Sequence, residues 1–139
     1  MTVISETLDL HTHREGEILN ITDKVEAAVS NSKIKNGVAF LFVPGSTAAL
    51  TTLEYEPGLL LDLPRMLERI APKSATYSHE EQWHDGNGHS HVRAALMGPD
   101  LFVPVRDGKL VLGTWQQIVF VELDIRARER TVILQLLGE

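Results

Sequence analysis

The sequence of 139 residues contains no cysteine, which excludes disulfides and thiolate metal sites. It has no apolar run of the roughly 18 to 20 residues that a membrane-spanning helix needs. The N-terminus lacks the basic stretch and apolar core of a secretory signal. Its 13 Lys and Arg are scattered and outnumbered by 19 Asp and Glu, whereas nucleic-acid surfaces gather positive charge. We therefore expect a cytoplasmic protein without a nucleic-acid or membrane partner.

Well-known catalytic motifs are also missing. There is no Walker loop, no dinucleotide-binding fingerprint and no Ser-His-Asp order. The hydrophobic content of 43% is ordinary for a globular protein, and the length fits one domain over residues 1–139.

Apolar patterns predict about eight strands. Residues 38–43 form a continuous apolar run, which is typical of a strand buried on both faces. Residues 114–124 alternate, so that Gln116 and Glu122 share a face with apolar side chains, as expected near a pocket or a subunit contact. Asp107-Gly108 between two apolar segments predicts a hairpin, because a type I′ turn needs positive φ at both central residues.

Helical spacing predicts about three helices, which begin near residue 22, at residue 57 and near residue 88. Residues 57–70 present one apolar face, and Pro64 either bends this helix or moves its start to Asp62. The order of elements indicates a single-domain α+β fold with mainly antiparallel or mixed sheet layers.

Two histidines and an asparagine occupy the short stretch GNGHSH at residues 86–91. If a helix begins near residue 88, Asn87 and His91 lie four residues apart on one face and His89 points elsewhere. If the segment is extended, His89 and His91 share a face and could chelate a metal together. The flanking glycines favour the first alternative. In the simplest interpretation, Asn87 only caps the helix.

The preceding stretch, YSHEEQWHD, adds His79, Trp83 and Asp85. Four of the six histidines thus fall within thirteen residues, and imidazole with carboxylate suits either proton transfer or a divalent cation. We expect Glu80 and Glu81 to belong to a solvated acidic loop. Trp83 could stack on a ligand ring or anchor the loop.

The stretch PGST ends a buried strand, so Ser46 and Thr47 could form an anion-binding turn. Glu54 follows the next strand and could act as a general base or a metal ligand. The arginines of DIRARER, residues 124–130, could clamp a phosphate or protect an edge strand against aggregation, and we favour the second role.

Three stretches together resemble the YjbQ family, whose members are also described as secondary thiamine-phosphate synthases. They are GSTAALTTLEYEPGLLLDL, YSHEEQWHDGNGHSHVRAALMGP and VPVRDGKLVLGTWQQIVFVELD, and the likeness extends over about residues 7–136. The resemblance implies an α+β fold, a homotrimer with polar pockets near subunit contacts, and a phosphorylated small-molecule substrate. The implied reaction joins a pyrimidine diphosphate to a thiazole phosphate and releases pyrophosphate.

The resemblance implicates a set of site residues: Thr47, Glu54, Asp62, His79, Asn87, His91, Thr114, Trp115, Gln116 and Glu122. Many relatives have a histidine where this chain has Gly45, and His89 is a hypothetical substitute for it. The family's Asp-Gly-Pro-Arg is replaced by DIRARER, so Arg126, Arg128 and Arg130 are alternative matches for its arginine.

The sequence hypothesis assigns catalysis to His91, Asn87 and Glu54. Ser46 and Thr47 would hold phosphate, and we expect His91 to face the Ser46 loop in a shared cavity. Trp83 or Trp115 would stack on a heteroaromatic ring. A divalent cation could bridge pyrophosphate and Glu54 or Asp62. The alternatives are a metal-dependent hydrolase that uses the histidine–carboxylate cluster, and a non-enzymatic module that binds small molecules.

Overall fold

The structure, a computed structural model, describes residues 1–139. The elements in chain order are β1 (Thr2–His11), β2 (Ile18–Asn20), α1 (Thr22–Ser32), β3 (Gly37–Phe42), β4 (Ala48–Glu54), α2 (Pro57–Ile70), α3 (Ser78–Trp83), α4 (Gly88–Met97), β5 (Asp100–Arg106), β6 (Lys109–Leu110), β7 (Gln116–Glu122) and β8 (Glu129–Gly138). Every strand pair is antiparallel, which confirms the predicted single-domain α+β class.

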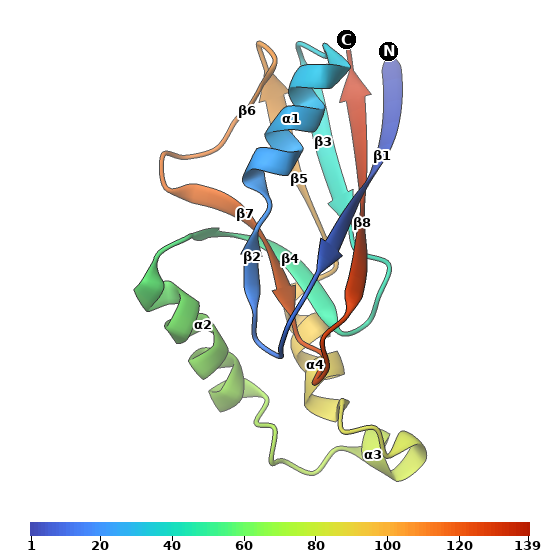
Figure 1. The fold of residues 1–139 in the computed structure, drawn as a ribbon, viewed down its shortest axis with the longest axis vertical. Coiled ribbons are helices and arrows are strands. Elements are labelled where there is room, and N and C mark those ends of the chain that lie inside the picture. Colours follow the sequence, from blue (N-terminus) through green and yellow to red (C-terminus); the bar gives the residue numbers. More distant parts are fainter.

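The strands form two sheets (Figure 1), a five-stranded sheet in the order β1-β8-β3-β5-β6 and a three-stranded sheet in the order β2-β7-β4. Strand β8 pairs with β1 from Thr2↔Gly138 to His11↔Glu129, and with β3 on its other side. The interpretation of the DIRARER arginines as protection of an edge strand is wrong, because β8 is an inner strand of its sheet and Arg128 and Arg130 form ion pairs with Asp124 and Glu122.

Strand β7 is buried on both faces and separates two apolar clusters. Ile118 and Phe120 belong to the larger cluster, which lies between the two sheets and includes residues of α1. Val119 and Val121 belong to the smaller cluster, which packs against α2 and α4. The predicted alternation along this strand thus accounts for three layers: the large sheet, the small sheet and the helices that cover it.

Helix α2 begins at Pro57, and the preceding Glu56 carboxylate accepts hydrogen bonds from the Gly58 and Leu59 N–H groups. The helix continues through Pro64, so the alternative start at Asp62 is wrong. The predicted hairpin turn is confirmed, with φ of 52° at Asp107 and 76° at Gly108.

The stretch expected to be a polar loop contains a short helix, α3, which has no buried residue. Glu80 is not merely solvated, because its carboxylate accepts hydrogen bonds from the N–H groups of Gly86 and Gly88. This contact closes the loop between α3 and α4 and fixes where α4 begins.

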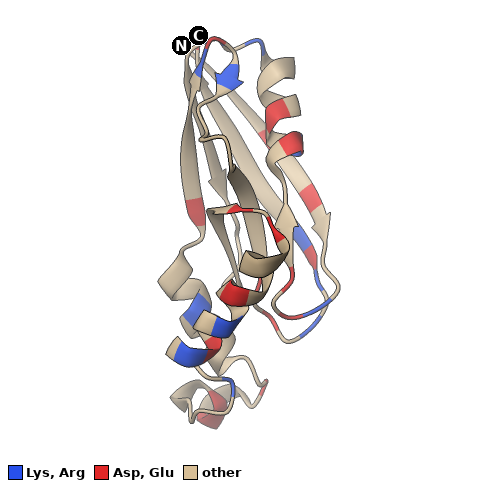
Figure 2. Ribbon diagram, turned by 90° about the vertical axis from the view of Figure 1, so that its left-hand side faces the viewer, with Lys and Arg blue, Asp and Glu red and all other residues tan.

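Both termini lie at one end of the long axis, and helices α2, α3 and α4 lie toward the other end (Figure 1). Figure 2 shows acidic and basic residues mixed along the molecule in that view. None of the helices combines the length and the apolar character needed to cross a membrane.

Candidate functional site

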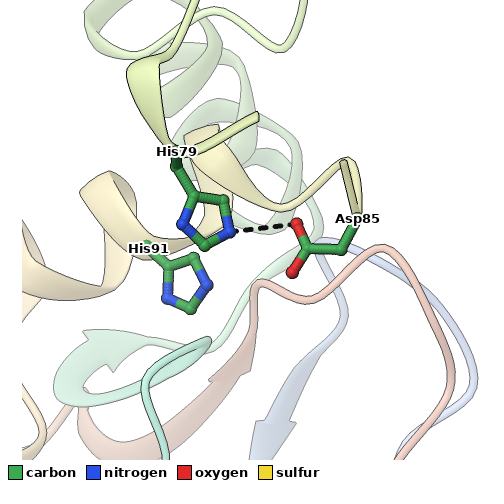
Figure 3. Close-up of side chains that lie close together, drawn as sticks. All are labelled: His79, Asp85 and His91. Carbon is green, nitrogen blue, oxygen red and sulfur yellow. Dashed lines mark hydrogen bonds and ion pairs between the residues drawn. The ribbon is translucent and has the colours of Figure 1, made fainter. Parts of the chain in front are cut away.

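Three side chains from the region of α3 and α4 converge at the surface (Figure 3). His79 lies on α3, Asp85 in the following loop and His91 on α4. His79 Nε2 is 3.0 Å from Asp85 Oδ1, and the two imidazole rings lie 4.5 Å apart between centroids. One ligand atom from each residue lies within 4.8 Å of the others, and all three side chains are half-buried.

The loop before α4 brings Asp85 to the histidines through unusual backbone conformations. His84 and Gly86 have φ of 51° and 76°, in the left-handed region that favours glycine. The Asp85 carboxylate then accepts a hydrogen bond of 2.9 Å from the Asn87 N–H group. Gly88 cannot be replaced easily, because a Cβ there would lie 2.6 Å from Cβ of Tyr77.

Asp85 is held in its charged form. The N–H group of Asn87 lowers the pKa of this carboxyl most, partial burial opposes it, and His79 and His91 lower it further. A carboxylate that stays ionised suits both a hydrogen bond from imidazole and a metal ion.

His91 is oriented by the loop between β3 and β4. Its Nδ1 lies 3.1 Å from the Ser46 carbonyl oxygen, and since a carbonyl only accepts, Nδ1 carries the proton. This contact leaves Nε2 free to bind a ligand. In metal sites generally, a histidine that binds the metal through one ring nitrogen donates the N–H of the other to a carbonyl or a carboxylate, and that hydrogen bond orients the ring. The prediction that His91 faces the Ser46 loop is confirmed.

Two imidazoles and one carboxylate are a donor set of catalytic zinc sites, in which three protein ligands leave one position open. The residues present therefore fit a divalent transition metal. A pocket of about 300 Å³ adjoins the trio of His79, Asp85 and His91, with His91 in its lining. It is lined by Gly45, Ser46, Ala48, His91, Ala94, Ala95 and Pro99.

Thr47 ends the loop between β3 and β4, and Glu122 ends β7. Both side chains belong to a buried ionic network. Arg130 donates through Nε to Glu122 Oε2 at 2.8 Å and through Nη2 to Thr47 Oγ1 at 2.8 Å. Thr47 in turn donates to Asp124 Oδ2 at 3.0 Å. Glu122 is fully buried, so it stabilises the region as the partner of Arg130.

Asn87 occupies the N-cap position of α4, yet its side chain makes no capping hydrogen bond. Its Oδ1 accepts hydrogen bonds from the Ile125 N–H group at 3.1 Å and the Ser90 hydroxyl at 2.9 Å. The residue therefore ties the start of α4 to the loop after β7, and its backbone carbonyl accepts a hydrogen bond from the His91 N–H group.

His89 lies on another face of α4, as the helical alternative predicted. Its side chain is buried and pairs with Glu15, which also accepts from Lys73 at 2.9 Å. Burial raises the pKa of Glu15, but the hydrogen bonds from His89 and Lys73 outweigh it and hold the pKa below its usual value. The hypothesis that His89 substitutes for a histidine at Gly45 is wrong, because its ring is committed to Glu15.

The remaining predicted site residues lie elsewhere. Glu54 pairs with Gln116 across β4 and β7, at the opposite end of these strands from Thr47, and Trp115 lines a separate pocket of about 370 Å³ with Glu54. Thr114 is exposed in the adjoining turn, Asp62 is exposed on α2, and Trp83 on α3 is 68% exposed. Their binding roles stay predictions, and none of these residues joins the trio within one chain.

Two residues of the region were absent from the predicted site. Asp85 was named as a carboxylate of the histidine-rich stretch, but the sequence assigned it no role in the site. Arg130 was one of three alternatives, and only the structure shows that it reaches the Thr47 loop.

Comparisons with known proteins agree with the fold and the motifs. Residues 6–139 match the family model described as UPF0047 protein YjbQ-like. A UPF0047 protein of Archaeoglobus fulgidus is 40% identical to this chain, and the match covers 94% of this chain and 98% of that protein. A UPF0047 protein of Methanothermobacter thermautotrophicus is also 40% identical, and the match covers 100% of this chain and 95% of that protein. The chain therefore belongs to the YjbQ (UPF0047) family.

Solved structures resemble the whole chain as well. A YbjQ-like protein of unknown function from Sulfolobus solfataricus superposes with a TM-score of 0.90 at 38% identity, covering 99% of this chain and 100% of the other. A hypothetical protein from Aeropyrum pernix gives 0.87 at 36% identity, covering 100% of both chains. The family assignment thus holds for sequence and for fold.

We predict that Asp124→Asn lowers the free energy of unfolding at neutral pH. The variant should also lose less of its free energy of unfolding than the wild type as the pH falls into the acid range. Burial raises the pKa of Asp124, but hydrogen bonds from the Arg126 N–H, Arg128 and Thr47 lower it more. Its stabilising contribution is present above the unfolded pKa of about 3.9 and disappears as pH falls through the lower folded value. Urea unfolding at several pH values measures both effects.

The control is Asp62→Asn, because exposed Asp62 makes no hydrogen bond or ion pair. Its unfolding curves should follow those of the wild type from neutral pH into acid. Identical pH dependence of the wild type and the Asp124→Asn protein would contradict the prediction.

Proposed function

We propose that this protein is an enzyme that acts on a phosphorylated small molecule with the help of a divalent metal ion held by His79, Asp85 and His91. The convergence of two imidazoles and an ionised carboxylate beside the Ser46 pocket is the observation that carries the proposal. A bound cation would supply Lewis-acid stabilisation of negative charge on phosphate oxygens.

The reaction we propose is the one that the family resemblance implies, the joining of a pyrimidine diphosphate to a thiazole phosphate. The C–O bond to pyrophosphate breaks while the thiazole ring nitrogen attacks the carbon, so the bonding pair leaves with pyrophosphate. Such a transfer needs positioning and charge stabilisation, and no covalent nucleophile. In this scheme Ser46 contacts phosphate, and Asn87 fixes the start of the helix that presents His91.

A metal-dependent hydrolase is a second candidate. Only three protein ligands converge in the trio, and sites of this kind keep a further position open for water or substrate. Release of phosphate from a substrate without a thiazole acceptor would favour this function over the transferase.

The metal site predicts that the purified protein binds Zn²⁺ or Mn²⁺ and that His91→Ala lowers the affinity by at least about tenfold, because a ligand is lost. His79→Ala and Asp85→Asn should have the same effect. Isothermal titration calorimetry after chelator treatment measures the affinity.

His84→Asn is the matched control. His84 is an exposed histidine of the same loop, and asparagine tolerates its positive φ. This variant should bind metal like the wild type. Equal metal affinity in the wild type and all three trio variants would remove the proposed site.

We predict that the metal-loaded protein forms thiamine phosphate from the two precursors, and that His91→Ala lowers the rate by at least about a hundredfold because the stabilising charge is lost. Chromatography of thiamine phosphate and an enzymatic assay of released pyrophosphate measure turnover. If wild-type turnover does not exceed that of the His91→Ala protein, the transferase is excluded.

The proposal includes a homotrimer, with the cytoplasm as its expected compartment. Several large apolar side chains are exposed in the single chain, among them Leu96, Phe102 and Trp115. Exposed apolar surface of this kind is typical of subunit contacts. We expect light scattering after size exclusion to give about three times the chain mass of 15.5 kDa. A mass of one chain would exclude the trimer.

A further inference from the structure

Arg130 holds one unused end of its guanidinium against the loop between β3 and β4, whose Ser46 carbonyl orients His91. Its Nε and Nη2 are occupied by Glu122 and Thr47, and the side chain is 11% exposed. Nη1 makes no hydrogen bond to the protein. Since a guanidinium has five N–H donors in a fixed fork, the two on Nη1 remain free.

Gly45 lies directly against Nη1 of Arg130. A Cβ built on Gly45 would lie 3.2 Å from Nη1, closer than an ordinary van der Waals contact. Gly45 also lines the pocket beside His91, and the carbonyl of the next residue, Ser46, accepts from His91 Nδ1. The free donors of Arg130 and the imidazole of His91 therefore flank the same short loop.

The loop itself offers further donors. The hydroxyl and N–H groups of Ser46 donate to no other protein group, and Ser46 is exposed. Arg130 cannot turn away from this position easily, because Glu122 and Thr47 hold the other two nitrogens. A preorganised guanidinium with neighbouring hydroxyl and amide donors is suited to a phosphate group.

We propose that Arg130 Nη1 and the Ser46 loop form an anion subsite for a phosphate or diphosphate group, and that glycine at position 45 is required for access to it. This inference rests on the proposed function, since it names the residue that would hold the phosphorylated end of that substrate.

The test is titration of inorganic pyrophosphate into the protein as purified, after its metal content has been measured. We expect Gly45→Ala to weaken pyrophosphate binding about tenfold, which corresponds to the loss of one charge-assisted hydrogen bond. The glycine does not have a positive φ, so alanine is compatible with its backbone. Its methyl group would cover Nη1.

Gly113→Ala is the matched control, since a Cβ there meets only Gln116 at 3.6 Å, an ordinary contact at the far end of β7. Its pyrophosphate affinity should equal that of the wild type. Arg130→Lys keeps a positive partner for buried Glu122 but lacks Nη1, so it should weaken binding as Gly45→Ala does. Thermal melting verifies that each variant is folded.

The outcomes separate this inference from the proposed metal site. Wild-type pyrophosphate affinity in folded Gly45→Ala protein, or no binding by the wild type, would overturn the subsite and leave metal binding unaffected. Weakened binding in the Gly45→Ala protein with unchanged metal affinity would support the subsite. If the wild type binds no Zn²⁺ or Mn²⁺ in the calorimetric titration but the Gly45→Ala protein still binds pyrophosphate more weakly than the wild type, the subsite stands and the proposed metal function fails.

Discussion

The buried ion pair between Glu122 and Arg130 organises the end of the molecule that carries the candidate site. Glu122 has no exposed surface, and its carboxylate accepts hydrogen bonds from Arg130, from the Thr12 hydroxyl and from the Asp124 N–H. Removing one partner of such a pair costs about 3–5 kcal/mol, because the other charge is left buried. The pair joins the ends of β7 and β8 to the Thr47 loop, and that loop orients His91. The geometry of a half-exposed site thus depends on a fully buried contact.

Periodicity predicted the layers of the fold but not the contacts of its charged side chains. The alternation around Phe120 and the Asp107-Gly108 turn depend on local rules, and both are confirmed. The glycine-rich turn predicted the start of α4 near residue 88, whereas the expected contact of His91 with the Ser46 loop joins residues 45 apart in the sequence and is confirmed only by the structure. The position of Asp85 could not be predicted from the sequence. It depends on left-handed backbone at His84 and Gly86 and on the Glu80 carboxylate, which holds the loop between α3 and α4. Arg130 was ambiguous because three arginines alternate along one short segment.

The trio of His79, Asp85 and His91 includes a residue of a weakly packed helix. Helix α3 has no buried residue and ends in a left-handed residue, so His79 is positioned mainly by Asp85 and by packing against α4. Segments with few buried apolar contacts open at low free-energy cost. A cation bound by His79, Asp85 and His91 would cross-link α3, the following loop and α4, and its binding free energy would order this segment. Ligand binding and local order are therefore coupled in the proposed site.

The residues that the family resemblance implicates fall into two groups that one chain cannot unite. Thr47 precedes β4, whereas Glu54 ends it, and seven antiparallel residue pairs with β7 hold the strand rigid in between. Seven strand residues extend over roughly 20 Å, too far for Glu54 or Trp115 to contact a substrate group bound at His91. No loop movement shortens that distance, because both groups are attached to the same paired strands. Only a second copy of the chain could bring them together, so the oligomeric state decides whether Glu54 and Trp115 share a site with His91 or serve a separate pocket.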